Sequence, residues 1–305
     1  KELIKTRFTM KKILVIFVLT LSFIFSLTAC NTDNQGGTNS NDSGIVYDDT
    51  QTDENENNNQ GDDTMDWKLQ TATYTINGVD FKMIFVEAGT FTMGSDRTDV
   101  AFSESPAHRV TLTKDYLMGE TEVTVALWNA VMGGNGGSNT MPKTSITRNQ
   151  AVQFAERLSQ IAHEQGIIPD DVNFHIPTEA QWEYAAKGGK YSNGYTYSGG
   201  NDINEVAVTL ENSGSSSPIS VKTKKPNELG LYDMSGNAYE WVYDMSGSYS
   251  SAEQTDPCNT SGSSYVKRGG SNYHSFNGED YLFTTTGRYF YRSTDYTIGT
   301  RICLY

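Results

Sequence analysis

Basic residues are scarce in this chain, which holds 23 Lys and Arg against 37 Asp and Glu and carries a formal net charge of -14. The imbalance is local, because residues 31–66 contain ten Asp or Glu, no Lys or Arg, and otherwise mostly Asn, Gly, Thr and Gln. Such a stretch has little to bury and repels itself, so residues 30–66 are predicted to form a disordered tether. An acidic protein also repels phosphates, which argues against a nucleic-acid partner.

Long apolar runs are missing as well. The run from Ile13 to Phe25 is shorter than the roughly 20 residues that a membrane-spanning helix needs. Because it follows Lys11-Lys12 and precedes Leu27-Thr28-Ala29-Cys30, residues 1–29 have the layout of an export signal that starts at Met10. The small residues before the cysteine resemble the lipobox of bacterial lipoproteins. This resemblance implies that Cys30 carries acyl chains that anchor the protein in a bacterial membrane. We expect display at the cell surface, on the outer membrane, although the sequence itself does not specify the membrane or the leaflet.

Cysteine is almost absent, since only Cys258 and Cys303 remain beyond Cys30. In an exported protein these two residues can form a disulfide, but the sequence does not show that they come within bonding distance. Two states therefore stay open, a Cys258–Cys303 disulfide and two separate thiols.

Residues 67–305 have the patterns of one folded α+β domain rich in loops. A strand is predicted over residues 80–86, where Phe81, Met83 and Phe85 share one face. A second strand is predicted over residues 108–112, which read HRVTL. The last hundred or so residues are predicted to contain short strands joined by turns of Gly, Ser and Asn.

Helix starts are marked by a hydroxyl residue three positions before a Gln. This capping-box pattern occurs at Thr147 and at Thr178, and it predicts a helix that runs to Gly166 and another that stops at Gly188-Gly189. A shorter helix is predicted over residues 125–132. No convincing helix signal follows Gly189.

Six ordered motifs carry a resemblance to a known family. They read FVEAGTFTMGS, ESPAHRVTL, GETEVTVALWNAVMG, IPTEAQWEYAAKGG, KPNELGLYDMSGNAYEWV and VKRGGS, and they span nearly all of residues 80–305. In this order they resemble the formylglycine-generating-enzyme (sulfatase-modifying factor) family. The resemblance implies a variant of the C-type lectin fold, with added helices and long loops around a small twisted sheet. Function has to be argued from the site, because one fold can serve many functions.

The copper ligands of active family members are missing from the sequence. Those enzymes hold copper with two cysteine thiolates, and by position the two would fall near His274 and Glu279. Residues 271–301 contain no cysteine. Iron-dependent relatives use a set of histidines, whereas the four here are scattered at positions 108, 163, 175 and 274. The sequence therefore predicts a protein that is not an enzyme and needs no cofactor, with an oxidase of altered metal chemistry as the alternative.

One metal site of the family has matching positions. The family often binds calcium through a tight loop, and the resemblance places carboxylates at Asp233 and Glu240 and backbone carbonyls at Gly236 and Ala238. Hard oxygen ligands on such a loop suit calcium. A plain turn held by Asp and Asn side chains explains the same residues equally well.

The C-terminal segment is rich in aromatic residues without helical or strand spacing. Between Asn272 and Tyr296 eight aromatics alternate with small regular pieces, which read GED, TTTGR, ST and TIGTR. This pattern resembles the variable region of diversity-generating retroelement proteins, in which a constant frame carries residues encoded by mutated Asn codons. Such codons cannot encode Trp, Met, Gln, Lys or Glu, and residues 272–298 contain only Glu279 from that set.

The resemblance predicts a ligand-binding site within residues 272–298. Tyr and Phe offer large contact area at low entropy cost, while Arg, Asn, His and Asp add polar contacts. The unknown ligand is expected to be a protein or glycan on another cell. A few of the predicted residues are expected to be buried, and a structural lipoprotein of the envelope remains a further alternative. The predicted binding residues are Tyr273, His274, Phe276, Asn277, Tyr281, Phe283, Tyr289, Phe290, Tyr291, Arg292, Asp295 and Tyr296.

Overall fold

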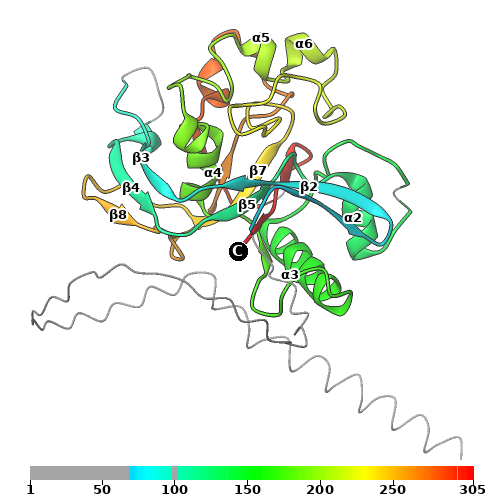
Figure 1. The fold of residues 1–305 in the computed structure, drawn as a ribbon. Helices are drawn as coiled ribbons and strands as arrows, with labels where there is room; N and C mark the ends of the chain where they lie inside the picture. The colour runs from blue at the N-terminus through cyan, green and yellow to red at the C-terminus, as the bar shows by residue number, and fades with distance from the viewer. Residues whose placement is uncertain (1–68, 98–101, 136, 294) are drawn as a thin grey trace, which may run out of the picture. The chain divides into compact units, whose positions relative to one another are not determined.

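The computed structural model describes residues 69–97, 102–135, 137–293 and 295–305 (Figure 1). The predicted signal peptide, Cys30 and the predicted tether lie outside these residues. Within the described residues, no helix combines the length and the apolar character that crossing a membrane requires.

Strands of the described residues form three sheets. Their orders are β1-β2-β5-β12-β6, β10-β9-β7-β11 and β3-β4-β8. Neighbours are antiparallel except for the pairs β11–β7 and β4–β8, which are parallel. The bounds are β1 Ala72–Ile76, β2 Val79–Val86, β3 Gly89–Met93, β4 His108–Leu112, β5 Tyr116–Gly119, β6 Phe174–His175, β7 Tyr239–Met245, β8 Gln254–Thr255, β9 Tyr265–Arg268, β10 Arg288–Tyr291, β11 Ile298–Thr300 and β12 Cys303–Leu304.

The five-stranded sheet has a hydrophobic cluster on each face. Along β2, Met83 enters a cluster with side chains of the helices α2 (Val125–Met132) and α3 (Arg148–Glu164), whereas Ile84 enters a cluster with side chains of α4 (Glu179–Ala186). Successive side chains of a strand point to opposite faces, so burial on both faces explains the nearly continuous apolar run of β2. The predicted strands over 80–86 and 108–112 are confirmed as β2 and β4.

The three predicted helices are confirmed, and the caps explain their starts. Thr147 and Thr178 each accept a hydrogen bond from the backbone of the Gln three residues later, whose side chain bonds back, so both capping boxes are complete. Thr124 caps α2 in the same manner, with a bond from the Leu127 backbone. Gly188 follows α4 with φ 91°, a backbone conformation that favours glycine.

Short helices beyond Gly189 were missed by the sequence reasoning. They are single turns, too short to show helical periodicity, and their caps and packing hold them in place. Asp202, for example, accepts a hydrogen bond from the Asn204 backbone at the start of one of them. Their bounds are α5 Ile203–Val206, α6 Leu210–Ser213 and the 3-10 turn η3 Asp280–Phe283; two further 3-10 turns lie at η1 Phe102–Glu104 and η2 Gly189–Tyr191.

The C-terminal segment contributes both edge strands of the four-stranded sheet. β10 lies at its edge beside β9, and β11 lies at the other edge beside β7. The segment between β9 and β10, orange in Figure 1, passes beside α5, where Phe276 and Tyr281 pack against a cluster that includes Ile203 and Val206.

Cys303 is a buried free thiol in β12. Its sulfur lies 3.7 Å from the backbone oxygen of His175, among the apolar side chains on the α4 side of the five-stranded sheet. The Cys258–Cys303 disulfide that the sequence left open is therefore wrong. Burial raises the pKa of the Cys303 thiol, which disfavours the reactive thiolate.

Candidate binding surface

Two of the predicted frame pieces form the buried part of the C-terminal segment. TTTGR covers residues 284–288, of which all but Thr286 are buried, and TIGTR covers residues 297–301, all of which are buried. The GED piece at residues 278–280 is exposed or half-buried instead. The prediction of a structural frame therefore fits TTTGR and TIGTR, and it does not fit GED.

Buried ion pairs tie the frame to the rest of the fold. Arg288 makes a two-point contact with Glu179 of α4, at 2.7 Å from Nε to Oε1 and 2.8 Å from Nη2 to Oε2. Arg268 of β9 pairs with Glu183 one helical turn later, and its Nη1 donates to the backbone oxygens of Thr286 (2.6 Å) and Gly287 (2.8 Å). Such charge-assisted, two-point contacts fix orientation as well as position.

Most of the predicted binding residues reach the surface. The most exposed rings are Tyr296 (52%) and Tyr273 (48%), followed by Phe290 and Tyr291 (38% each). Asn277 and Arg292 are also exposed. The half-buried members of the predicted set are His274, Phe276, Tyr281, Tyr289 and Asp295.

Ring contacts join part of this set into one continuous surface. Ring centroids lie 5.3 Å apart between Tyr296 and Tyr273, 5.7 Å between Tyr273 and His274, and 5.6 Å between His274 and Tyr239 of β7. Tyr239 in turn contacts Tyr289 at 5.9 Å, and all four pairs are edge-to-face, as aromatic pairs prefer. A hydrogen bond with Tyr273 is the main cause that raises the pKa of Tyr296 to about 12.

A half-buried lysine lies beneath these rings. Lys267 of β9 places its Nζ 3.8 Å from the centre of the Tyr239 ring, 5.0 Å from that of Tyr291, and 3.8 Å from Oδ2 of Asp295. Burial lowers the pKa of Lys267, while the carboxylate of Asp295 opposes that shift. We call Tyr273, His274, Tyr289, Tyr291, Asp295 and Tyr296, with Tyr239 and Lys267 beneath them, the aromatic surface.

Phe283 was wrongly predicted to be displayed. Its ring is fully buried and packs in the cluster that contains Tyr197 and Val206. The turn η3 directs the ring inward, and Ser235 fixes the backbone there by donating its hydroxyl to the Phe283 carbonyl at 2.7 Å. The burial of Phe283 could not be predicted from the sequence, because Phe283 has the same chemistry as exposed residues of the segment such as Phe290.

The predicted binding residues 289–291 do not all point to one face. These residues belong to the strand β10, whose side chains alternate, so Tyr289 and Tyr291 share a face that Phe290 does not. Phe290 packs instead near the Arg288 guanidinium, 4.9 Å from its ring centre. Tyr289, one of the predicted binding residues, is half-buried against Tyr239.

Glu211 of α6 is a positioning residue that sequence reasoning missed. Its carboxylate accepts hydrogen bonds from the Ser275 hydroxyl, from the Phe276 backbone (3.3 Å) and from the Asn277 side chain (3.4 Å). It therefore holds the loop next to the aromatic surface. No local signal could have revealed it, because Glu211 lies far from this loop in the sequence.

His274 and Glu279 lie together, with 3.5 Å between Nδ1 and Oε2. These are the two positions at which the family resemblance placed the copper-binding cysteines. Their proximity is what a shared metal site would require, but an imidazole and a carboxylate are much poorer ligands for copper(I) than two thiolates. Burial lowers the pKa of His274, although Glu279 opposes the shift.

The four candidate calcium residues differ in what their oxygens already bind. Both carboxylate oxygens of Glu240 accept hydrogen bonds at 2.7 Å, from Arg301 on each and from the Trp182 indole on one. Asp233 accepts one bond, from the Lys222 backbone at 2.8 Å, and its Oδ1 has no hydrogen-bond partner among the described residues. Gly236 and Ala238, the two carbonyl positions, lie in the buried loop between them.

Comparison with known proteins gives three informative relatives. Treponema denticola variable protein 1 aligns in structure over 77% of this chain and 99% of its own, with a TM-score of 0.66 and 30% identity. The chaperone protein LppX of Paenibacillus barcinonensis is 30% identical over 207 residues, 53% of this chain and 71% of that one. The formylglycine-generating enzyme of Bos taurus is 28% identical over 249 residues, 62% of this chain and 65% of the enzyme.

The family itself is matched over most of the chain. Residues 77–301 match the sulfatase-modifying factor enzyme 1-like domain. The structural likeness confirms the predicted α+β fold, a C-type lectin fold of the formylglycine-generating-enzyme variety. The chain therefore belongs to the family of sulfatase-modifying factor enzyme 1-like domains.

Proposed function

We propose that this protein is a ligand-binding lipoprotein, displayed on the cell surface, whose aromatic surface is diversified by a retroelement. The proposal rests on one observation, which is that the C-terminal segment divides into buried pieces and exposed residues. The TTTGR and TIGTR pieces are mostly buried, while most of the residues predicted to vary are exposed or half-buried. A surface built over such a frame can change its ligand without a change of fold.

The chemistry of the surface supports a macromolecular ligand, a protein or glycan on another cell. Exposed apolar area of this kind is unusual on a monomer and marks interaction sites. Tyr273, Tyr291 and Tyr296 combine large rings with hydroxyl groups, which suits both kinds of ligand. The likeness to Treponema denticola variable protein 1 supports the same proposal.

Sequences of the 3′ end of the gene from several isolates test the diversification. We expect differences to concentrate at the exposed positions 273, 277, 291, 292 and 296 and to spare Phe283 and Arg288. In the same strains, Cys30→Ser is expected to move the protein from the membrane to the soluble fraction. A tail that is invariant across isolates would contradict the proposal and favour a structural envelope protein.

An oxidase of altered metal chemistry is the second candidate, favoured by the family and by the contact between His274 and Glu279. We propose that the protein is not catalytic and requires no cofactor for binding, because these two side chains replace the thiolates that the reaction needs. Incubation with copper, oxygen and a cysteine-containing sulfatase peptide is expected to give no formylglycine by mass spectrometry. Turnover above a control with copper alone would support the oxidase instead.

A further inference from the structure

The strand β2 has a neighbour on both sides along only part of its length. β1 pairs with it over residues 79–83, whereas β5 pairs with it over residues 83–86. One further bond joins the two chains on the β5 side, from the Glu120 backbone N–H to the Lys82 carbonyl at 2.9 Å. Residues 79–81 therefore lack a partner strand on this side within the described part of the chain.

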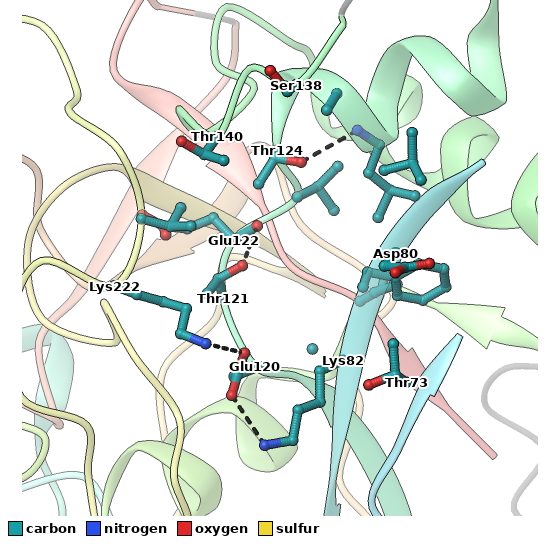
Figure 2. A pocket seen from close by; sticks show the side chains of 18 of the residues that line it. Thr73, Asp80, Lys82, Glu120, Thr121, Glu122, Thr124, Ser138, Thr140 and Lys222 are labelled. Atoms are coloured by element: carbon teal, nitrogen blue, oxygen red, sulfur yellow. Dashed lines mark hydrogen bonds and ion pairs between the residues drawn. The ribbon is translucent and has the colours of Figure 1, made fainter. Parts of the chain in front are cut away.

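The chain diverges from β2 after Glu120 because other contacts hold it. The Val123 N–H donates to the Thr300 carbonyl at 2.8 Å, and the Val123 carbonyl accepts from the Lys143 N–H at 2.7 Å. Residues 121–124 and the free edge of β2 thus form the two sides of a fork. The fork holds a groove of about 730 Å³, which Figure 2 shows from close by.

The backbone groups of Asp80 point into this groove. Backbone groups of alternate residues on a strand point to the same side, and the Lys82 carbonyl points to the β5 side. The turn at Asn77-Gly78 agrees, because a two-residue hairpin closes on a hydrogen-bonded pair, here Ile76 and Val79. Val79 therefore bonds to β1, and Asp80 offers one donor and one acceptor to a further strand.

Apolar side chains line one face of the groove. Val79 and Phe81 of β2 and Val123 and Leu127 on the opposite side of the fork all line it. The four belong to the same hydrophobic cluster or pack against it. Val79 and Phe81 are only half-buried, so part of their apolar surface remains available to a ligand.

Polar side chains line the other face. Because side chains alternate along a strand, Asp80 and Lys82 point away from the apolar cluster. Figure 2 shows Lys82 and Lys222 on either side of Glu120, at 3.2 and 2.7 Å from its oxygens. These charges are already paired, so this face favours an uncharged polar side chain.

We propose that an extended peptide segment of another protein binds in this groove and adds a strand to the free edge of β2. In such binding, backbone hydrogen bonds supply affinity and alternate side chains supply specificity. The residue opposite Asp80 is polar and its two neighbours are apolar, because they continue the two faces of β2.

The position of the edge argues for a single extended segment. Because residues 121–124 form the other side of the fork, one strand fits between them and β2, whereas the same edge of a second copy lies inside its own fork. Among the described residues, the groove shares none of its lining with the aromatic surface. The site is therefore independent of the proposed variable binding site.

The test uses the purified protein and a fluorescein-labelled pentapeptide, acetyl-Val-Ser-Val-Ser-Val-amide, with fluorescence anisotropy as the readout. The serines take the polar positions, so their N–H groups face β2. N-methylation of both serines is expected to weaken binding roughly tenfold or more, because it removes these donors. N-methylation of two valines is the matched control and is expected to have a much smaller effect.

Variants of Asp80 test the same contact from the protein. Asp80→Pro removes the N–H that faces the groove and is expected to weaken peptide binding roughly tenfold, while Asp80→Ala keeps it. Both substitutions remove the bond from the Thr75 hydroxyl to the Asp80 carboxylate (2.6 Å), so their difference isolates the N–H. If Asp80→Pro does not fold, the peptide has to slow hydrogen exchange of the Asp80 amide in the unmodified protein.

Three results would overturn the proposal. One is the lack of peptide binding at millimolar concentration. Another is an equal effect of N-methylation at serine and at valine, which would show that apolar contacts alone fill the groove. The third is self-association of the protein that the peptide disrupts, which would make a second copy the occupant.

Discussion

Arg288→Ala is expected to lower the melting temperature by roughly 10 °C, because removal of one partner of a buried ion pair costs about 3–5 kcal/mol. Arg288 is 2% exposed, and its loss leaves the carboxylate of Glu179 buried without its two-point contact. Two further bonds are lost, from Nη1 to the backbone oxygens of Ser103 and Gly247, both at 2.9 Å. Thermal unfolding followed by circular dichroism measures the effect.

Arg292→Ala is the matched control, since Arg292 lies one residue beyond Phe290-Tyr291 and is exposed. Among the described residues, its Nη2 donates to the Ser263 hydroxyl, at 3.3 Å. Surface changes of this kind shift stability by about 0.5 kcal/mol or less, so the melting temperature should change by no more than a few degrees. Equal effects of the two substitutions would show that the frame and the displayed residues are not physically distinct.

The elements that sequence predicted well are those with local causes. The helices α3 and α4 begin at Thr147 and Thr178 because each capping box lies within four consecutive residues. The strand β2 could be predicted from its own apolar pattern. The order of the six family motifs indicated the order of the other elements along the chain. The TTTGR and TIGTR pieces could be separated from their aromatic neighbours because their composition differs.

The contacts that sequence could not predict join residues far apart in the chain. Glu179 meets Arg288, Glu183 meets Arg268, and Glu211 holds the loop that begins at Ser275. Nothing in the local pattern of a glutamate says which arginine or loop it will reach.

Burial of individual aromatics could not be predicted either, and it depends on local backbone direction. Phe283 ends the turn η3 and faces inward, whereas Tyr291 ends the strand β10 and faces outward. A residue's codon class says whether a retroelement could produce it, and says nothing about the direction of its side chain. The structure therefore removes Phe283 from the predicted binding residues.

Phe283→Ala is expected to destabilise the fold by about 3–5 kcal/mol, because it removes a fully buried ring and leaves a cavity. The triple substitution of Tyr273, Tyr291 and Tyr296 by Ser removes three rings and should cost less than about 2 kcal/mol. Part of that cost is the edge-to-face contact between Tyr273 and Tyr296, so the three effects are not additive. Chemical denaturation of both variants measures the difference.

The two variants separate a displayed ring from a core ring of the same segment, which is the physical distinction that a diversified binding surface needs. If these tyrosines vary freely among isolates, the fold has to tolerate their loss at little cost. Phe283 cannot vary in that way, because its ring fills space between Tyr197 and Val206. A triple variant as unstable as Phe283→Ala would show that the exposed rings also hold the fold together. The aromatic surface would then be part of the core, and its proposed role in ligand binding would lose its physical basis.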